Sequence, residues 1–80
     1  MAQHVSIEFT IEPFTDGSPG AHVTTAVAAV EALGVAVDLG PFGSSCIVTA
    51  EQAGTVVAAL MNAAYANGAT HVSVHAERMD

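Results

Sequence analysis

Residues 4–12 read HVSIEFTIE, a stretch in which polar and apolar side chains alternate without a break. A period of two is typical of a β-strand that buries one face and leaves the other polar. Pro13 ends this stretch, and residues 15–18 (Thr-Asp-Gly-Ser) have the composition of a loop. Residues 70–78, near the other end of the chain, alternate in the same way. The two stretches predict two strands of one half-buried sheet.

The segment after the first loop has the spacing of a helix. Ser18 suits the N-cap, Pro19 the first helical position, and Gly34 the position just past the last turn. The apolar positions recur at helical intervals, and they are Val23, Val27, Val30 and Leu33. We therefore expect an amphipathic helix that begins at Pro19.

A second helix is predicted after a capping box, in which Thr49 is the cap and Gln52 the third helical residue. Asn67 and Gly68 are expected to end it. One side of this helix is apolar, and its members are Ala53, Val56, Val57, Leu60, Ala64 and Tyr65. That side is expected to face the sheet.

Between the helices, residues 35–39 and 44–48 read as two further strands joined by a turn at residues 40–43. The order of elements is then strand, helix, strand, strand, helix, strand. Two amphipathic helices and half-apolar strands make a two-layer α+β sandwich. Right-handed crossovers favour the ferredoxin-like arrangement, βαββαβ with the antiparallel sheet order 4-1-3-2. Residues 1–80 are too few for a second domain.

The chain is acidic, with eight Asp and Glu against a single basic residue and a formal net charge of -7. Phosphate binding needs clustered Lys and Arg, so neither nucleic acid nor an anionic membrane is an expected partner. We see no signal peptide and no apolar run of about 20 residues that could span a bilayer, which favours a cytoplasmic protein. With Cys46 as the only cysteine there is no internal disulfide, and self-association is an expected source of stability.

One candidate site is the end of the sheet where three loops meet. It carries Phe14 and Phe42, each directly after a proline, together with Asp16, Ser44 and Ser45. Aromatic faces with a carboxylate and hydroxyls suit a flat, polar, cationic ring. The alternative is that both phenylalanines only cap the end of the core.

The second candidate surface is the sheet face away from the helices. Alternation places a set of polar side chains there, namely Ser6, Glu8, Thr10, Ser73, His75 and Glu77. Such a face is either solvated, as is common for antiparallel sheets, or covered by another subunit. The small uncharged members favour homo-oligomerisation through this open face.

Metal and nucleophile chemistry find little support in the sequence. His71 and His75 share a strand face but lie about 13 Å apart along it, too far to bind one ion together. We therefore predict no metal site. Cys46 is expected to be a small core or interface residue. His75 and Glu77 could form an acid–base pair, but no nucleophile or oxyanion motif accompanies them, so no enzyme activity is expected.

Three short motifs follow one another along the chain. Residues 5–13 form a strand that ends in proline, residues 40–45 read GPFGSS, and residues 68–80 run from a glycine through the last strand to Arg-Met-Asp. In this order and spacing the motifs resemble those of the YkoF-like thiamine-binding proteins, which are small ferredoxin-like domains. The resemblance extends over nearly the whole chain.

The resemblance implies a non-catalytic homo-oligomer that binds thiamine or its hydroxymethylpyrimidine moiety, in vitamin salvage or carriage, without a further cofactor. In this hypothesis Phe14 and Phe42 stack on or enclose the ring. Hydrogen bonds to the pyrimidine nitrogens come from Asp16, Ser44 and Ser45. If the pocket opens onto the sheet face, Glu8 and Thr10 are further candidates.

Two alternatives stay open. The first is a structural or regulatory oligomerisation domain without a small ligand. The second is an enzyme on a dimeric barrel with the same order of elements, which would use His75 and Glu77 in a cavity between sheet and helices. Strand alternation places His75 on the opposite face, which counts against the enzyme.

Overall fold

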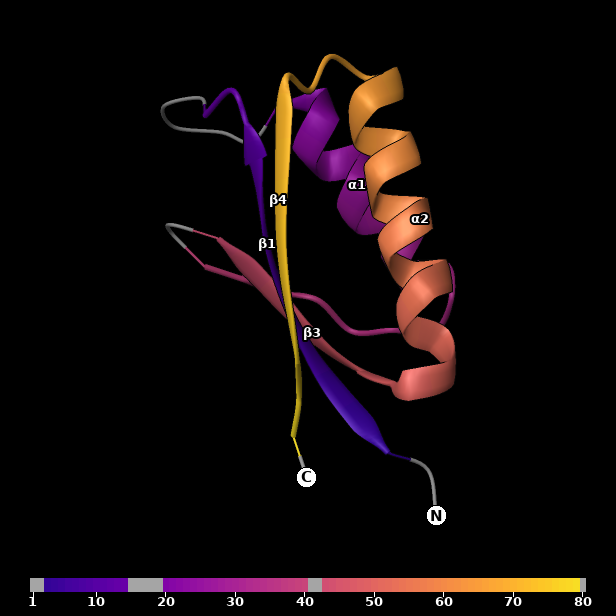
Figure 1. The fold of residues 1–80 in the computed structure, drawn as a ribbon. Helices are drawn as coiled ribbons and strands as arrows, with labels where there is room; N and C mark the ends of the chain where they lie inside the picture. The colour runs from indigo at the N-terminus through magenta and orange to yellow at the C-terminus, as the bar shows by residue number, and fades with distance from the viewer. Residues whose placement is uncertain (1–2, 15–19, 41–42, 80) are drawn as a thin grey trace.

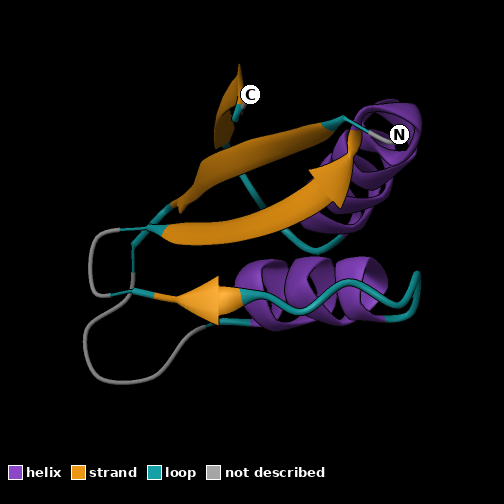
Figure 2. Cartoon of the chain, turned by 90° about the horizontal axis from the view of Figure 1, so that it is seen from below, coloured by secondary structure: helices purple, strands orange, loops and turns teal. Residues whose placement is uncertain are grey.

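Within residues 3–14, 20–40 and 43–79, which the computed structural model describes, the chain forms a four-stranded antiparallel sheet with two helices on one face (Figures 1 and 2). The elements are β1 (His4–Glu12), α1 (Ala21–Glu31), β2 (Asp38–Leu39), β3 (Ser44–Thr49), α2 (Ala50–Ala66) and β4 (His71–Arg78). The strands lie in the order β2-β3-β1-β4. Counted from the other edge, this is the predicted order 4-1-3-2, and the predicted βαββαβ sandwich is confirmed.

The central strand β1 divides its side chains between the two faces as the alternation predicts. Ile7, Phe9 and Ile11 are buried toward the helices, whereas Glu8 on the other face is exposed. Directly opposite residues of antiparallel neighbours point to the same face. Glu8 is paired with Ser45 of β3 and with His75 of β4, so all three belong to the open face.

The core fills the space between β1 and the two helices. Its largest fully buried side chains are Ile7, Val30, Val56 and Leu60. The prediction of the apolar helix sides is wrong at two positions, since Leu33 and Tyr65 are both exposed. Leu33 lies in the turn beyond the last residue of α1, and Tyr65 is in the last turn of α2.

The start of α1 differs from the prediction. Gly20 is the N-cap and Ala21 the first helical residue, so neither Ser18 nor Pro19 has the predicted position; both lie outside the described residues. His22 is buried, and its Nε2 donates to the Pro13 carbonyl at 2.6 Å. A Cβ on Gly20 would lie 2.7 Å from Cε1 of His22, so the glycine leaves the space that the imidazole occupies.

Strand β2 is shorter than predicted. Only Asp38 and Leu39 pair with β3, whereas residues 35–39 were expected to form the strand. Val35 is buried and Val37 half-buried, so these side chains pack at the margin of the core instead of extending the ladder. The glycine expected after α1 is confirmed at Gly34, which has a φ of 84°.

The predicted capping box of α2 is confirmed. The hydroxyl of Thr49 accepts from the Gln52 amide at 3.2 Å, and Oε1 of Gln52 accepts from the Thr49 amide at 3.3 Å. Thr49→Ala should therefore lower the free energy of unfolding by about 1 kcal/mol, measured by urea denaturation. Thr55→Ala, at an exposed position within the same helix, is the matched control and should not lower it. An equal loss in both variants would mean that the box contributes nothing.

Candidate functional site

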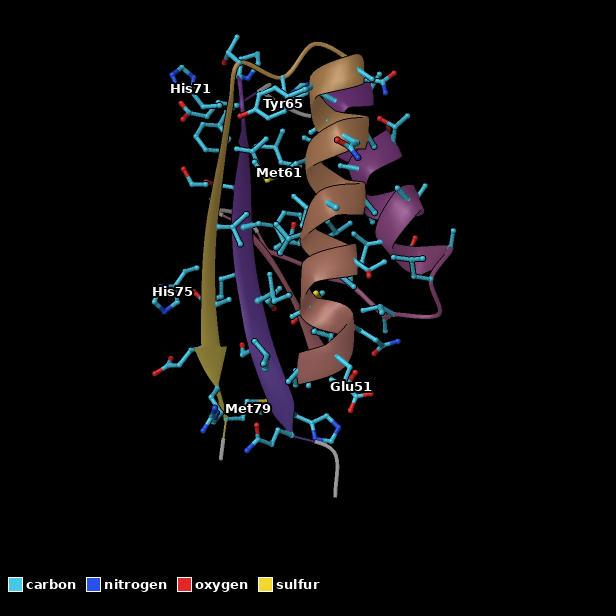
Figure 3. The ribbon with its side chains drawn as sticks, turned by 45° about the vertical axis from the view of Figure 1, so that its right-hand side comes forward. Glu51, Met61, Tyr65, His71, His75 and Met79 are labelled. Carbon is cyan, nitrogen blue, oxygen red and sulfur yellow. The ribbon has the colours of Figure 1, made fainter. Side chains whose placement is uncertain are left out.

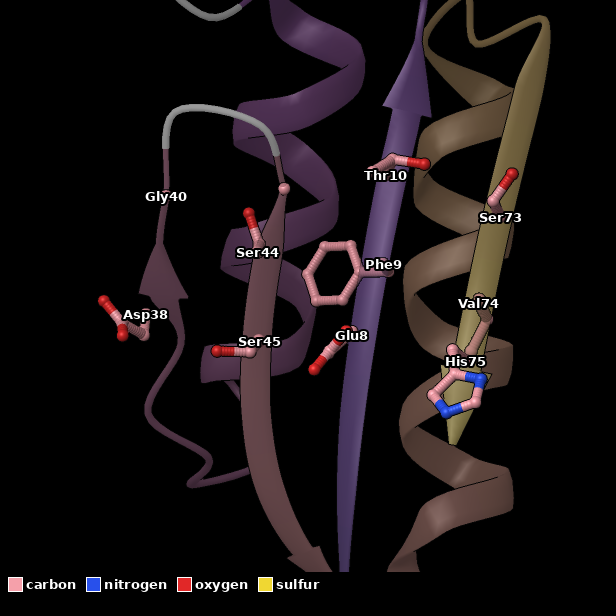
Figure 4. A pocket seen from close by; sticks show the side chains of 11 residues that line it. Glu8, Phe9, Thr10, Asp38, Gly40, Ser44, Ser45, Ser73, Val74 and His75 are labelled. Carbon is pink, nitrogen blue, oxygen red and sulfur yellow. The ribbon is translucent and has the colours of Figure 1, made fainter. Parts of the chain in front are cut away.

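A hollow of about 550 Å³ opens where β1, β3 and β4 lie side by side (Figure 4). The residues that line it are Glu8, Phe9, Thr10, Asp38, Gly40, Gly43, Ser44, Ser45, Ser73, Val74 and His75. Most of the polar members belong to the open face, and Figure 4 shows the ring of Phe9 between β1 and β3. The hollow therefore combines polar side chains with a lining whose larger part is apolar.

One row of side chains crosses the sheet at the hollow. Asp38 of β2 is paired with Ser45 of β3, Ser45 with Glu8 of β1, and Glu8 with His75 of β4. Because paired residues share a face, the four side chains form a single polar row on the open face. Neighbouring strands lie about 4.8 Å apart, so the two carboxylates come from strands separated by roughly 10 Å.

The second row of the hollow is made by Thr10 and Ser73, which are paired across β1 and β4. Gly43 lies close against this end of β1. A Cβ at Gly43 would be 3.2 Å from Cγ2 of Thr10 and 3.3 Å from the carbonyl oxygen of Phe9. Glycine at position 43 thus allows the backbone there to approach β1, and Gly43 itself lines the hollow.

The charges near the hollow are mainly negative. Glu8 and Asp38 are exposed carboxylates, and the whole chain contains a single basic residue, Arg78. Nε2 of His75 lies 3.9 Å from Oε2 of Glu77, and both side chains are largely exposed. A surface with carboxylates and hydroxyls accepts hydrogen bonds and favours a cationic ligand over an anionic one.

The structure brings together four of the seven predicted site residues, since Glu8, Thr10, Ser44 and Ser45 all line the hollow. Phe14 does not line it, and its side chain is 69% exposed, so it neither encloses this space nor caps the core. The buried residue at this end of β1 is His22, which donates to the Pro13 carbonyl. The predicted residues Asp16 and Phe42 lie outside the described part of the chain.

Sequence reasoning missed Asp38 and Gly43. Asp38 joins the row only because β2 pairs with β3 in the register that puts it opposite Ser45. The same register continues one pair further, where the Gly40 amide donates to the Gly43 carbonyl at 2.8 Å. The sequence does contain a signal for this pair. If residues 40–43 are taken as a four-residue turn, Leu39 pairs with Ser44 and Asp38 pairs with Ser45.

Metal and thiol chemistry have little support among the described residues. Ranges 3–14, 20–40 and 43–79 contain no group of three His, Cys, Asp or Glu side chains placed to hold a metal ion. Cys46 is buried among the core side chains, and this burial raises the pKa of its thiol. The thiol is therefore protonated at neutral pH and packs as a small apolar group. His75 and Glu77 lie on the open face, away from the space between sheet and helices.

Comparison with solved structures bears on the fold. A domain of unknown function, DUF77, from Bacillus cereus superposes with a TM-score of 0.70 at 20% identity, covering 99% of this chain and 77% of that chain. A protein from Streptococcus pneumoniae superposes with a TM-score of 0.71 at 15% identity, covering 96% of this chain and 86% of that one. The fold is ferredoxin-like.

At the sequence level, no family model and no curated protein matches this ferredoxin-like domain. The identities to the solved structures are low, so the similarity concerns the fold and not what the hollow binds. In the described part of the domain, no helix is long and apolar enough to cross a membrane.

Proposed function

We propose that this ferredoxin-like domain is a non-catalytic binding protein for a small, flat, cationic heterocycle, namely thiamine or its hydroxymethylpyrimidine moiety. The observation that carries the proposal is the polar row of Asp38, Ser45, Glu8 and His75 along the hollow. Ligand sites commonly have volumes of about 300–1,000 Å³, and the hollow is within this range.

The hollow offers complementary groups for each part of such a ligand. The Glu8 carboxylate would accept hydrogen bonds from an exocyclic amino group, and such charge-assisted bonds are the stronger ones. The hydroxyls of Thr10, Ser45 and Ser73 both donate and accept, as ring nitrogens and a hydroxymethyl group require. At the β2 end of the row, the Asp38 carboxylate would compensate the positive charge of a thiazolium.

The resemblance to YkoF-like proteins supports this ligand class and a role in vitamin salvage or carriage. All four site candidates on the described strands belong to the quoted motifs of that resemblance and also line the hollow, namely Glu8, Thr10, Ser44 and Ser45. The proposed contacts therefore lie nearer the sheet face than the loop end, because these residues line the hollow.

Isothermal titration calorimetry tests the proposal. The purified chain is titrated with thiamine and, separately, with hydroxymethylpyrimidine. Saturable heat with both would locate recognition in the pyrimidine, and heat with thiamine alone would require the thiazolium. A folded protein that gives no heat with either compound would overturn the proposal.

A second candidate function is a ligand-free oligomerisation domain that uses the open face. Ile47 is 58% exposed, and it is paired with Ser6, which places it on that face below the hollow. Met79 at the end of β4 is also exposed. An exposed apolar pair beside small polar residues suits a second sheet. If Ile47→Asp dissociates an oligomer that binds neither compound, this second function is the correct one.

A further inference from the structure

The hollow carries negative charge at two places of its polar row. Glu8 and Asp38 lie on either side of Ser45, and both carboxylates are exposed (Figure 4). The whole sequence contains one Lys or Arg, namely Arg78. The position of this arginine therefore decides whether the hollow has a permanent cation for an anionic group of a ligand.

Arg78 belongs to the other face of the sheet. It is paired with Val5, and Val5 packs against the core on the helix side. Because directly opposite residues share a face, the Arg78 side chain leaves β4 on the face away from the polar row. Val5 is also three residues from Glu8 along β1, which corresponds to roughly 10 Å. The guanidinium is thus not placed to meet a group bound over the row.

Of the four histidines, His75 lines the hollow. Figure 3 shows its imidazole on the side of the sheet away from the helices. It is paired with Glu8, and its Nε2 lies 3.9 Å from Oε2 of Glu77. Any positive charge on this imidazole is therefore balanced by two carboxylates that the chain itself supplies. His71, the other histidine of this face, is paired with Glu12.

The backbone does not supply a partner for an anion at the polar row either. Helix N-termini can bind phosphate, but both helices cover the other face of the sheet (Figure 1). The first turn of α2 also carries an acidic residue, Glu51. Strand β1 lies between β3 and β4, so its amides are used within the sheet. What remains are hydroxyls, which donate hydrogen bonds without compensating a charge, from Thr10, Ser44, Ser45 and Ser73.

We infer that the hollow binds the free alcohol form of its ligand and rejects the phosphate ester, with Asp38 as the residue that determines this specificity. The inference rests on the proposed function, because it takes thiamine as the ligand. The hydroxyethyl group of thiamine is attached to the thiazolium ring, which is proposed to lie beside Asp38. A phosphate ester of this hydroxyl would bring a charge of about −1.5 to −2 to the carboxylate at pH 7.

The two forms of the ligand differ in what they offer to Asp38. The free hydroxyl donates a hydrogen bond to the carboxylate, and such charge-assisted bonds are the stronger ones. The ionised phosphate ester has acceptor oxygens in the same place, so a favourable contact becomes a repulsive one. Placing a like charge against the unwanted ligand is a general means of achieving specificity.

Calorimetry of the full chain with three compounds at pH 7.5 tests the inference. These are thiamine, thiamine monophosphate and the acetate ester of thiamine, which enlarges the ligand at the same oxygen without adding charge. The monophosphate should bind about a hundredfold more weakly than thiamine, whereas the acetate ester should lose at most about tenfold.

Two results would overturn the inference while leaving the proposed function intact. One is equal affinity for thiamine and its monophosphate. The other is an equal loss with both esters, which would mean that the hollow excludes size and not charge. A folded protein that binds none of the three compounds would instead contradict the proposed function, and the inference with it.

A variant assigns the specificity to its residue. Asp38→Asn keeps the size of the side chain and removes its charge, and Asp38 is exposed on a two-residue strand, so the fold should be kept. The ratio of the affinities for thiamine and its monophosphate should fall about tenfold. Glu31→Gln, at the end of α1, is the matched control and should keep the wild-type ratio. If both variants keep it, Asp38 does not determine the specificity and the inference is wrong.

Discussion

Leu60→Ala should remove most of the stability of this domain. Leu60 is fully buried at the centre of the face that α2 turns toward the sheet, among Ile7 and Val56. Truncation of a buried leucine costs about 2–5 kcal/mol, because the transfer free energy of the lost methyl groups adds to that of the cavity. Small domains have a total stability of about 5–15 kcal/mol, and one of this size is expected near the lower end.

Urea denaturation followed by circular dichroism measures this loss. Leu39→Ala is the matched control, because Leu39 is exposed on the short strand β2 and the same atoms are removed. The control should change the free energy of unfolding by less than about 1 kcal/mol. Equal losses in the two variants would mean that Leu60 does not occupy the centre of the core.

Glu8→Gln should weaken the binding of thiamine about tenfold to a hundredfold. The substitution keeps the shape of the side chain and removes the negative charge at the middle of the polar row. A hydrogen bond to a charged group contributes about 1.5–3 kcal/mol, and each 1.4 kcal/mol corresponds to a factor of ten in affinity. Because Glu8 is exposed, the stability of the fold should not decrease.

Calorimetry of the two proteins side by side gives the comparison. Glu31→Gln makes the same change of charge at an exposed position at the end of α1 and should bind thiamine as the wild type does. If both variants lose affinity equally, the general acidity of the chain attracts the ligand and the row has no particular role. If neither loses affinity, the site lies elsewhere.

Much of the fold could be predicted because its signals are local. The alternation in residues 4–12 and 70–78 gave β1 and β4 within a residue, and the capping box fixed the beginning of α2. The beginning of α1 could not be predicted in this way. Ser18 and Pro19 have the right composition, but the helix starts after Gly20, where His22 reaches Pro13 across the chain.

The candidate site was harder to predict because it depends on contacts between distant residues. The prediction of Phe14 and Phe42 rests on their chemistry and their place beside prolines, and neither feature fixes the direction of a ring. Glu8 and Ser45 meet only through the pairing of β1 with β3, and Asp38 joins them through a further pairing. Alternation gives the face of each residue, but the register decides which of them are neighbours.

The brevity of β2 has a consequence for kinetics. Two residues hold this strand on β3, so its separation exposes little apolar area and needs far less free energy than global unfolding. The amides of Asp38 and Gly40 should therefore exchange with solvent deuterium through a local opening, long before those of Ile7 and Phe9. Such an opening carries Asp38 away from Ser45 while the core stays intact. The part of the hollow that Asp38 lines therefore opens in this local event. A bound ligand that holds Asp38 in place would slow amide exchange at this edge first.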